Sequence, residues 1–346
     1  MWPYWLMYAA PALAALLAAP GRKSAIWPPW LLLGLFFTLC IGFREHVGGD
    51  WGNYLPYYTR EIGAAFTDPL KGGDIGYVLL NRLMARLEWG IYGVNTVCGL
   101  IFVSGLIAFC RAQYRAWLAF AVAVPYIVIV VAMGYTRQGV ALGLIFFGLT
   151  RLEQGKFLQY AALITLAAMF HKTAMIMIPL GMFLYQKGWL FRAAAVALIG
   201  HSLWDALMAP SLGNLWASYV EQRMFSQGAV IRVAMNCAAA FFLFVFWKEW
   251  KRTYPNALLW LWMACAAVAS VFLVGLAPTA VDRLGLYLTP LQVAVFSRLP
   301  YLARRQQDPE VTARLLLLAY GAALFVWLHY AVHARYWLPY RNALFE

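Results

Sequence analysis

Apolar runs about as long as a lipid bilayer is thick recur along nearly the whole chain of 346 residues. A helix needs about 20 residues to cross a hydrocarbon core of about 30 Å. The runs lack the alternation of apolar and polar side chains that membrane β-barrels require. Composition agrees, because 64% of the residues are hydrophobic and 12% are charged, about half the charged fraction of soluble domains. The sequence therefore predicts an all-α polytopic integral membrane protein.

The apolar runs predict about 12 transmembrane helices, within a range of about 11 to 13. They cover residues 3–20, 27–43, 91–110, 117–134, 139–150, 157–170, 174–186, 190–208, 230–247, 257–276, 284–297 and 313–330. Residues 1–346 are expected to form a single transmembrane domain. The longest polar interruption, residues 44–90, is expected to be a large periplasmic loop that contains short amphipathic helices.

Positive charge in the short loops predicts the orientation, because Lys and Arg near helix ends are retained in the cytoplasm. The first apolar run ends in small residues, as a signal peptide does, but its basic residues Arg22 and Lys23 follow the run. This arrangement favours a retained helix with the N-terminus outside. The cytoplasmic loops then hold 15 of the 27 basic and 4 of the 14 acidic residues. The net charge of +13 mostly reflects this bias, so no nucleic-acid partner is expected.

Several motifs of soluble enzymes are missing from the sequence. There is no Walker loop, H-E-x-x-H, C-x-x-C or G-x-G-x-x-G, which argues against ATPase, zinc-protease, redox and dinucleotide-binding functions. There is also no D-x-D pair, so we expect metal-free chemistry and no cofactor. Free thiols are expected at the five cysteines, which lie in or beside apolar runs at unrelated spacings.

Polar pairs at the outer ends of apolar runs are not explained by the charge bias of the loops. They are Arg137 with Gln138, His171 with Lys172, and Asp282 with Arg283. A charged side chain at membrane depth costs about 2.5–3.5 kcal/mol unless it faces a polar cavity or a partner. These pairs therefore predict a shared anion-binding cavity. The competing interpretation is that each charge is a snorkelling anchor, and we assign this role to Arg232, Arg335 and Arg341.

The stretch HVGGDWGNY, residues 46–54, follows an apolar run and brings the chain out of the membrane. Its adjacent glycines are expected to let the backbone and Asp50 approach a sugar-phosphate closely. Tyr54 and Tyr57 suit stacking on sugar rings, and they suit anchoring at the headgroup level equally well.

The motifs VGGDWGNY, DIGYVLLNRL, TRQGVALGL and FHKTAM together resemble the EpsG family of Wzy-like polysaccharide polymerases. The resemblance covers roughly residues 40–185, with weaker support from DRLGLYL further along. Where the family often has a glutamate before the GY segment, this chain has the shorter Asp74.

The resemblance implies a membrane glycosyltransferase, GT-C-like in broad design, that polymerises undecaprenyl-pyrophosphate-linked oligosaccharide repeat units. The reaction is expected on the periplasmic face of the bacterial inner membrane, in exopolysaccharide or O-antigen biosynthesis. Its expected partners are the lipid-linked glycan donor and acceptor and the lipid bilayer. A flippase and a chain-length regulator of the same pathway are further expected partners.

The site residues are assigned from the chemistry of this transfer. A base must take a proton from the acceptor hydroxyl, and arginines stabilise charge on the leaving diphosphate. We assign the base to Asp50 and a donor role to His171, and the exchanged assignment stays open. Another possibility is that Asp50 only pairs with Arg44. The expected substrate-binding residues are Arg44, Tyr54, Asp74, Arg137, Gln138, Lys172, Asp282 and Arg283.

Two other functions are compatible with parts of the sequence. A flippase or transporter would move the same lipid-linked glycan, but such proteins commonly have two similar halves, and the TRQ and HK stretches have no counterpart in the second half. An O-antigen-ligase-like enzyme would share the donor chemistry and differ in its acceptor.

Overall fold

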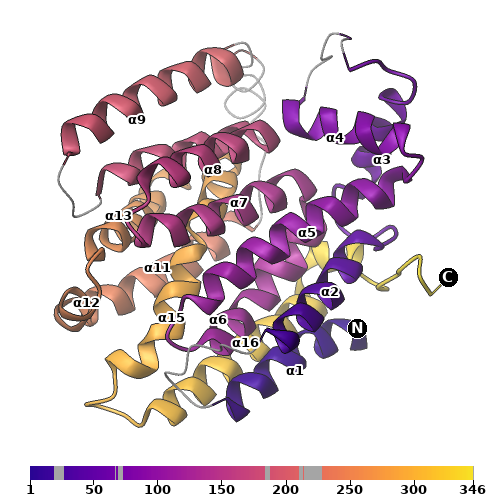
Figure 1. Cartoon of the computed structure of the whole chain (residues 1–346). Helices are drawn as coiled ribbons and strands as arrows, with labels where there is room; N and C mark the ends of the chain where they lie inside the picture. Colours follow the sequence, from indigo (N-terminus) through magenta and orange to yellow (C-terminus); the bar gives the residue numbers. More distant parts are fainter. Residues whose placement is uncertain are drawn as a thin grey trace. The chain divides into compact units, whose positions relative to one another are not determined.

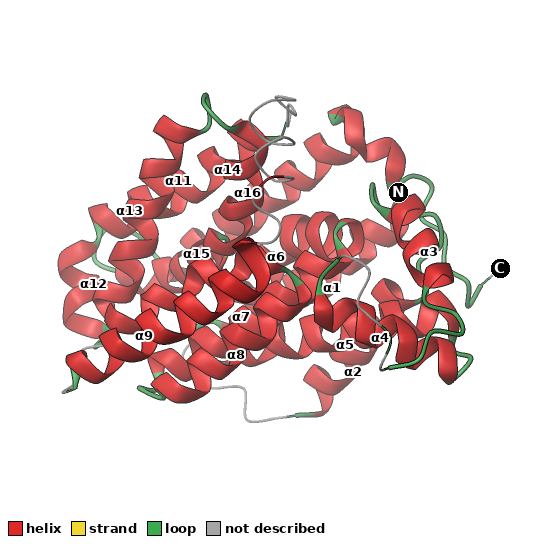
Figure 2. Ribbon diagram, turned by 90° about the horizontal axis from the view of Figure 1, so that it is seen from above, coloured by secondary structure: helices red, strands yellow, loops and turns green. Residues whose placement is uncertain are grey.

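The computed structural model describes residues 1–18, 27–66, 68, 73–183, 188–209, 213 and 228–345. Every regular element in this part of the chain is a helix (Figure 1 and Figure 2), so the all-α class is confirmed. Each predicted apolar run coincides with helical segments, with boundaries shifted by a few residues. Arg22, Lys23 and Lys187, which the sequence assigns to cytoplasmic loops, lie outside the described residues.

The chain divides into two compact units. The first comprises Met1–Leu144, Met169–His171 and Ala313–Glu346, and the second comprises Ile145–Ala168 and Lys172–Thr312. The expected single transmembrane domain of residues 1–346 stays a prediction.

The first unit is built around a close pair of helices, α2 and α5 (Figure 1). A Cβ atom at Gly42 would lie 2.3 Å from the Thr96 hydroxyl oxygen. Small residues allow such close packing of apolar helices, and this contact fixes the end of α2 beside α5. The helices of this unit are α1 (Trp2–Leu17), α2 (Pro28–Gly42), α3 (Trp51–Arg60), α4 (Ile75–Arg86), α5 (Gly90–Arg111), α6 (Ala116–Ala123), η1 (Val124–Ala132), the first half of α7 (Thr136–Glu153), most of α16 (Pro309–Tyr330), and η7 (Val332–Tyr336).

Residues 331–345, which we name the strap, follow α16 and return to the loop after α2. The Phe43 carbonyl oxygen accepts a hydrogen bond from the Ala343 amide (2.8 Å), and the Glu45 amide donates to the Arg341 carbonyl oxygen (3.1 Å). The Gly48 amide donates to the Tyr336 carbonyl oxygen (2.8 Å). These bonds hold the backbone on both sides of Arg44.

Trp337 anchors the strap in the core of the first unit. Its side chain is 2% exposed, and its indole N–H donates to the Ile129 carbonyl oxygen at 2.8 Å. Ile129 lies in the π-helix η1, a wider helix type that is often found at functional sites. A Cβ atom at Gly134 would lie 2.4 Å from the Trp337 ring, so the indole occupies space that only glycine leaves open.

The second unit contains a buried ion pair enclosed by aromatic rings. Arg298 donates to Glu153 at 2.7 Å, and the Trp260 indole donates to the same carboxylate at 2.8 Å. The Arg298 guanidinium lies over the rings of Trp250, Tyr254 and Trp260 at 4.4–5.3 Å. The sequence assigned Arg298 to a cytoplasmic loop, but it lies in α15 and its side chain is 4% exposed.

The helices of the second unit include one close antiparallel pair of long elements, α11 and α13, which pack against each other. Its elements are the second half of α7, most of α8 (Phe157–Phe170), η2 (Lys172–Phe183), α9 (Trp189–Leu203), η3 (Trp204–Met208), α11 (Ala229–Val245), α12 (Trp247–Thr253), α13 (Ala257–Leu273), α14 (Pro278–Gly285), η6 (Leu286–Leu288) and α15 (Pro290–Leu302).

Three helices of the described residues are long and apolar enough to cross a membrane: Gly90–Arg111, Trp189–Met208 and Pro309–Tyr330. Ala229–Val245 and Trp247–Thr253 make a fourth if this pair, bent by 77°, is one span. The other apolar helices are shorter, because breaks and changes of helix type interrupt the apolar runs. The chain is a helical membrane protein, while the count of 12 spans and the GT-C-like design stay predictions.

Candidate functional site

Arg44 is a buried cation directly after α2. Its side chain has no exposed surface, and its guanidinium donates to the Ile41 carbonyl oxygen and, at 2.6 Å, to the Thr136 hydroxyl. Burial lowers the pKa of the Arg44 guanidinium, yet arginine stays protonated in proteins. Its Nε has no hydrogen-bond partner among the described residues. Neutral oxygen atoms therefore hold this cation, and one donor is left over.

Thr136 connects Arg44 to the start of α7, where Arg137 follows. Arg137 donates through Nη1 to the Asp74 carboxylate at 2.8 Å and lies over the Tyr57 ring at 5.3 Å. Asp74 occupies the N-cap position of α4, but its side chain does not cap that helix. The Arg137 side chain is 24% exposed, and its Nε has no partner among the described residues. Arg137 is therefore oriented by Asp74 and keeps one side available.

Tyr54 links these groups to Asp50. Burial raises the pKa of Tyr54 to about 12, and the negative charge of Asp50 acts in the same direction, while Arg137 and Arg44 oppose it. The Tyr54 phenol therefore stays protonated at neutral pH. Its ring is 2% exposed and packs against Tyr77, with centroids 5.7 Å apart. The expected stacking of Tyr54 on sugar rings does not fit this burial, so its hydroxyl is the group that faces the charged residues.

Asp50 stands at the N-cap position of α3, and its carboxylate makes no capping bond. The preceding turn depends on Gly48, which has φ +106° and whose Cβ atom would lie 2.3 Å from the Met133 carbonyl oxygen. The glycine thus permits approach to the backbone of the chain itself, a different reason from the approach to a sugar-phosphate that the sequence suggested. Asp50 is half-buried.

His171 lies beside the start of α4. A Cβ atom at Gly76 would lie 3.2 Å from the Met169 carbonyl oxygen and from the Phe170 ring. Because Gly76 is two residues from Asp74, this contact brings residues 169–171 next to the charged groups. The His171 side chain is 8% exposed.

The structure thus gathers five of the predicted site residues in the first unit. We name this group the Arg44 cluster, and its members are Arg44, Asp50, Tyr54, Asp74 and Arg137. Gln138 is the next residue of α7. It is 5% exposed, and its Nε2 has no hydrogen-bond partner within the described part of the chain.

A model of the EpsG family matches residues 29–342, nearly the whole chain. This chain belongs to the EpsG family. The family is related to the Wzy-like polysaccharide polymerases, so this EpsG-family chain has a role of the polysaccharide-polymerase kind. Comparisons with curated proteins and with solved structures found no match.

The matched region of this EpsG-family chain is much longer than the motifs that carry the resemblance in the sequence. It extends to Asn342, which forms a β-bridge with Arg44. The strap therefore lies mostly within the matched region, although it has no motif that the sequence analysis could use.

The remaining predicted site residues of the EpsG-family chain lie in the second unit. Asp282 accepts a hydrogen bond from Arg232, so Arg232 is an ion-pair partner and the sequence was wrong to treat it as an anchor. Lys172 and Arg283 are half-buried. The cavity expected to join all these residues would include groups from both units, and it stays a prediction.

The structure also identifies site residues that the sequence analysis missed. Thr136 accepts from Arg44, and Tyr77 packs on Tyr54. Both lie inside motifs of the EpsG family, TRQ and DIGY, so the motifs were a usable signal. No feature of the sequence pointed to Arg232 as the partner of Asp282, because 50 residues separate them.

Proposed function

We propose that this EpsG-family chain polymerises oligosaccharide repeat units carried on undecaprenyl pyrophosphate. The transfer takes place on the periplasmic face of the inner membrane, where the acceptor hydroxyl attacks the anomeric carbon of the donor and the lipid diphosphate leaves. The observation that carries the proposal is Arg44, a fully buried cation with neutral hydrogen-bond acceptors and an unused Nε donor.

Binding of a diphosphate at the Arg44 cluster would offset the cost of that buried charge. Arg44 and Arg137 both act on Tyr54, so a bound anion would lie between two guanidinium groups that offer paired hydrogen bonds. The N-terminus of α7 begins at Thr136 and adds the positive end of a helix dipole. Gln138 supplies a further N–H donor in this first turn. The role of Asp74 is to orient Arg137.

Asp50 is the proposed general base. Its carboxylate makes no helix cap and acts electrostatically on Tyr54, which places it in the same cluster as the two arginines. His171 is the proposed donor to the substrate or the leaving group. Lys172, Asp282 and Arg283 are proposed to bind substrate from the second unit, with Asp282 held by Arg232.

The decisive experiment supplies the purified protein with lipid-linked repeat units and resolves the products by size. A ladder of longer glycans supports the polymerase. If the substrate only changes leaflet in proteoliposomes, the protein is a transporter. If the glycan moves once to a different lipid acceptor and no ladder forms, the protein is a ligase.

A further inference from the structure

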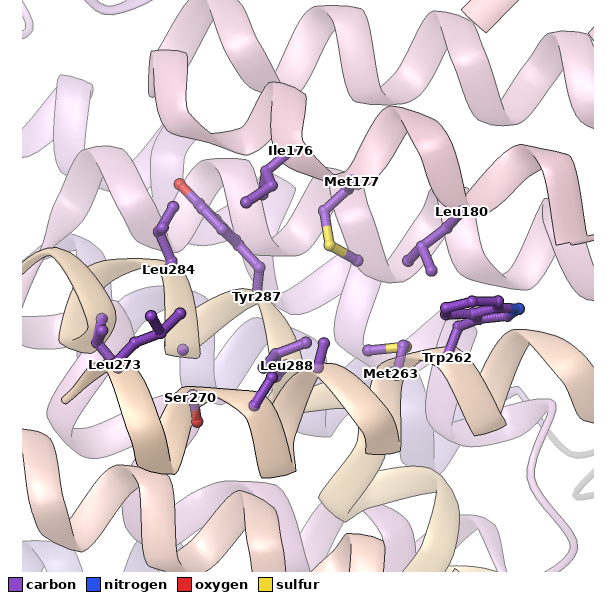
Figure 3. A pocket seen from close by; sticks show the side chains of 14 residues that line it. Ile176, Met177, Leu180, Trp262, Met263, Ser270, Leu273, Leu284, Tyr287 and Leu288 are labelled. Carbon is purple, nitrogen blue, oxygen red and sulfur yellow. The ribbon is translucent and has the colours of Figure 1, made fainter. Parts of the chain in front are cut away.

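A cavity of about 280 Å³ lies within the second unit, between η2, α13 and the segment of α14 and η6. Figure 3 shows Met177 and Leu180 on one side, with Met263 and Leu288 facing them. Tyr287 stands toward one end and Trp262 toward the other. The cavity is therefore elongated between a tyrosine and a tryptophan.

The wall of the cavity offers apolar contact and little hydrogen bonding. Its two hydroxyl groups already have partners: Ser270 donates to the Ala267 carbonyl oxygen at 2.6 Å, and the Tyr287 hydroxyl pairs with Thr173 at 3.0 Å. A polar group placed there would lose its hydrogen bonds to water without replacement. Methionine side chains adapt to irregular apolar shapes, so the cavity suits a flexible hydrocarbon chain.

The cavity opens to the surroundings of the protein. Ile176, Trp262 and Leu273 line it, and their exposed fractions are 50%, 48% and 51%. In a helical membrane protein such an opening gives access to a ligand that arrives from the bilayer. A long chain entering the cavity can continue outward past these side chains.

Cationic side chains accompany the end of the cavity near Tyr287. Thr173, the partner of Tyr287, directly follows Lys172, and Arg283 lies in α14 between the lining residues Val281 and Leu284. Arg232 pairs with Asp282 in the same helix. The Arg232 charge is thus matched by a carboxylate, while Lys172 and Arg283 add two positive charges.

We propose that this cavity binds the first isoprene units of the polyprenyl chain of the lipid-linked substrate, with its diphosphate at Lys172 and Arg283. The inference rests on the proposed function and deepens it. A diphosphate linkage carries one negative charge on each phosphate, which matches two cations, whereas a phospholipid phosphodiester carries a single charge. Charge complementarity therefore favours the polyprenyl diphosphate over a bilayer phospholipid.

The test measures binding of farnesyl diphosphate to the purified full chain by calorimetry. Ala269 lines the cavity, and Ala269→Trp fills it; the neighbouring Val268 is 38% exposed and does not line it, so Val268→Trp is the matched control. Ala269→Trp should weaken farnesyl diphosphate binding at least about tenfold, and Val268→Trp should leave it unchanged. The smaller Ala266→Leu should weaken binding in the same direction if Ala269→Trp fails to fold.

Equal binding by wild type and both cavity variants would overturn the inference. So would displacement of farnesyl diphosphate by an equal concentration of phosphatidylglycerol, because a phospholipid would then be the occupant. Cavity-dependent binding without any glycan ladder would contradict the proposed polymerisation and leave the lipid site standing. A ladder that forms while binding ignores the cavity would contradict the lipid site alone.

Discussion

At the scale of single residues, the chemistry of the site depends on which groups hold each charge. Arg44 is buried with neutral acceptors, whereas Arg137 uses Nη1 for Asp74 and leaves Nε unused within the described residues. Asp50 reaches the same cluster through its effect on Tyr54. These differences allow the roles of the three charged residues to be separated by substitution.

Arg137→Lys should reduce polymer formation about tenfold or more with unchanged protein level. A lysine can keep the pairing with Asp74, but it offers a point charge in place of a planar fork, and a lost charge-assisted hydrogen bond costs about 1.5–3 kcal/mol. The measurement is the quantity of polymer per unit of protein. Arg335→Lys, at an exposed arginine of the strap, is the matched control. Near-normal polymer from Arg137→Lys would return Arg137 to the anchors.

Asp50→Asn should insert normally, bind lipid-linked substrate and lose most of its turnover. Removal of a general base typically costs a factor of ~10²–10⁴ in rate. Single-turnover kinetics and substrate binding are measured side by side, with the exposed Glu88→Gln as the control. If Asp50→Asn turns over normally while His171→Ala binds substrate without turnover, His171 is the base.

Tyr54→Phe should lower the rate by the same factor across pH 6 to 9. The pKa of Tyr54 is raised to about 12, so the phenol is protonated throughout this range and loses its proton only in more alkaline solution. The pH–rate profile of the variant is compared with that of the wild type. A change in the apparent pKa values of the profile would show that Tyr54 titrates or tunes the base.

At the scale of elements, the strap is the feature that fixes the loop after α2. Its backbone pairs on both sides of Arg44, and Trp337 fills the space beside Gly134. Gly134 is two residues before Thr136, the acceptor of Arg44. The strap and η1 therefore position both the buried arginine and its partner.

Trp337→Phe should lower thermal stability and polymer formation together. The substitution leaves the Ile129 carbonyl oxygen without its indole donor, and an unsatisfied buried group costs about 1–3 kcal/mol. Thermal unfolding in detergent measures this change. Trp89→Phe is the control, because Trp89 is 61% exposed and surface substitutions usually change stability by less than about 0.5 kcal/mol. An unchanged unfolding temperature for Trp337→Phe would contradict the anchoring role.

At the scale of the whole molecule, the orientation in the membrane determines on which side the Arg44 cluster lies. The charge bias of the loops places residue 53 outside and residue 251 inside. Asn53 and Lys251 are both exposed, so the protein itself does not shield either position from a reagent.

Single cysteines at positions 53 and 251, in a cysteine-free background, should differ in labelling by a membrane-impermeant thiol reagent added from outside. Position 53 should react, and position 251 should react only after the membrane is permeabilised. Mass spectrometry or gel shift measures the labelled fraction. The reverse pattern would overturn the orientation and the periplasmic site.

The sequence by itself determined the class of the protein and the places of its helices. Both depend on local properties, namely the length and hydropathy of each run, and the EpsG motifs are likewise local. The sequence could not determine whether each run is one membrane-crossing helix, because the π-helix η1 and the 3₁₀-helix η2 interrupt the regular spacing within apolar runs that look continuous.

Only the tertiary structure decided which charges meet. The sequence joined neighbours such as Arg137 and Gln138, yet consecutive residues of a helix do not face each other. The carboxylate that orients Arg137 is Asp74, which is 63 residues away, and the acceptor of Arg44 is Thr136, which is 92 residues away. A hydrogen bond needs two groups within about 3 Å, and the packing of distant segments alone sets that distance.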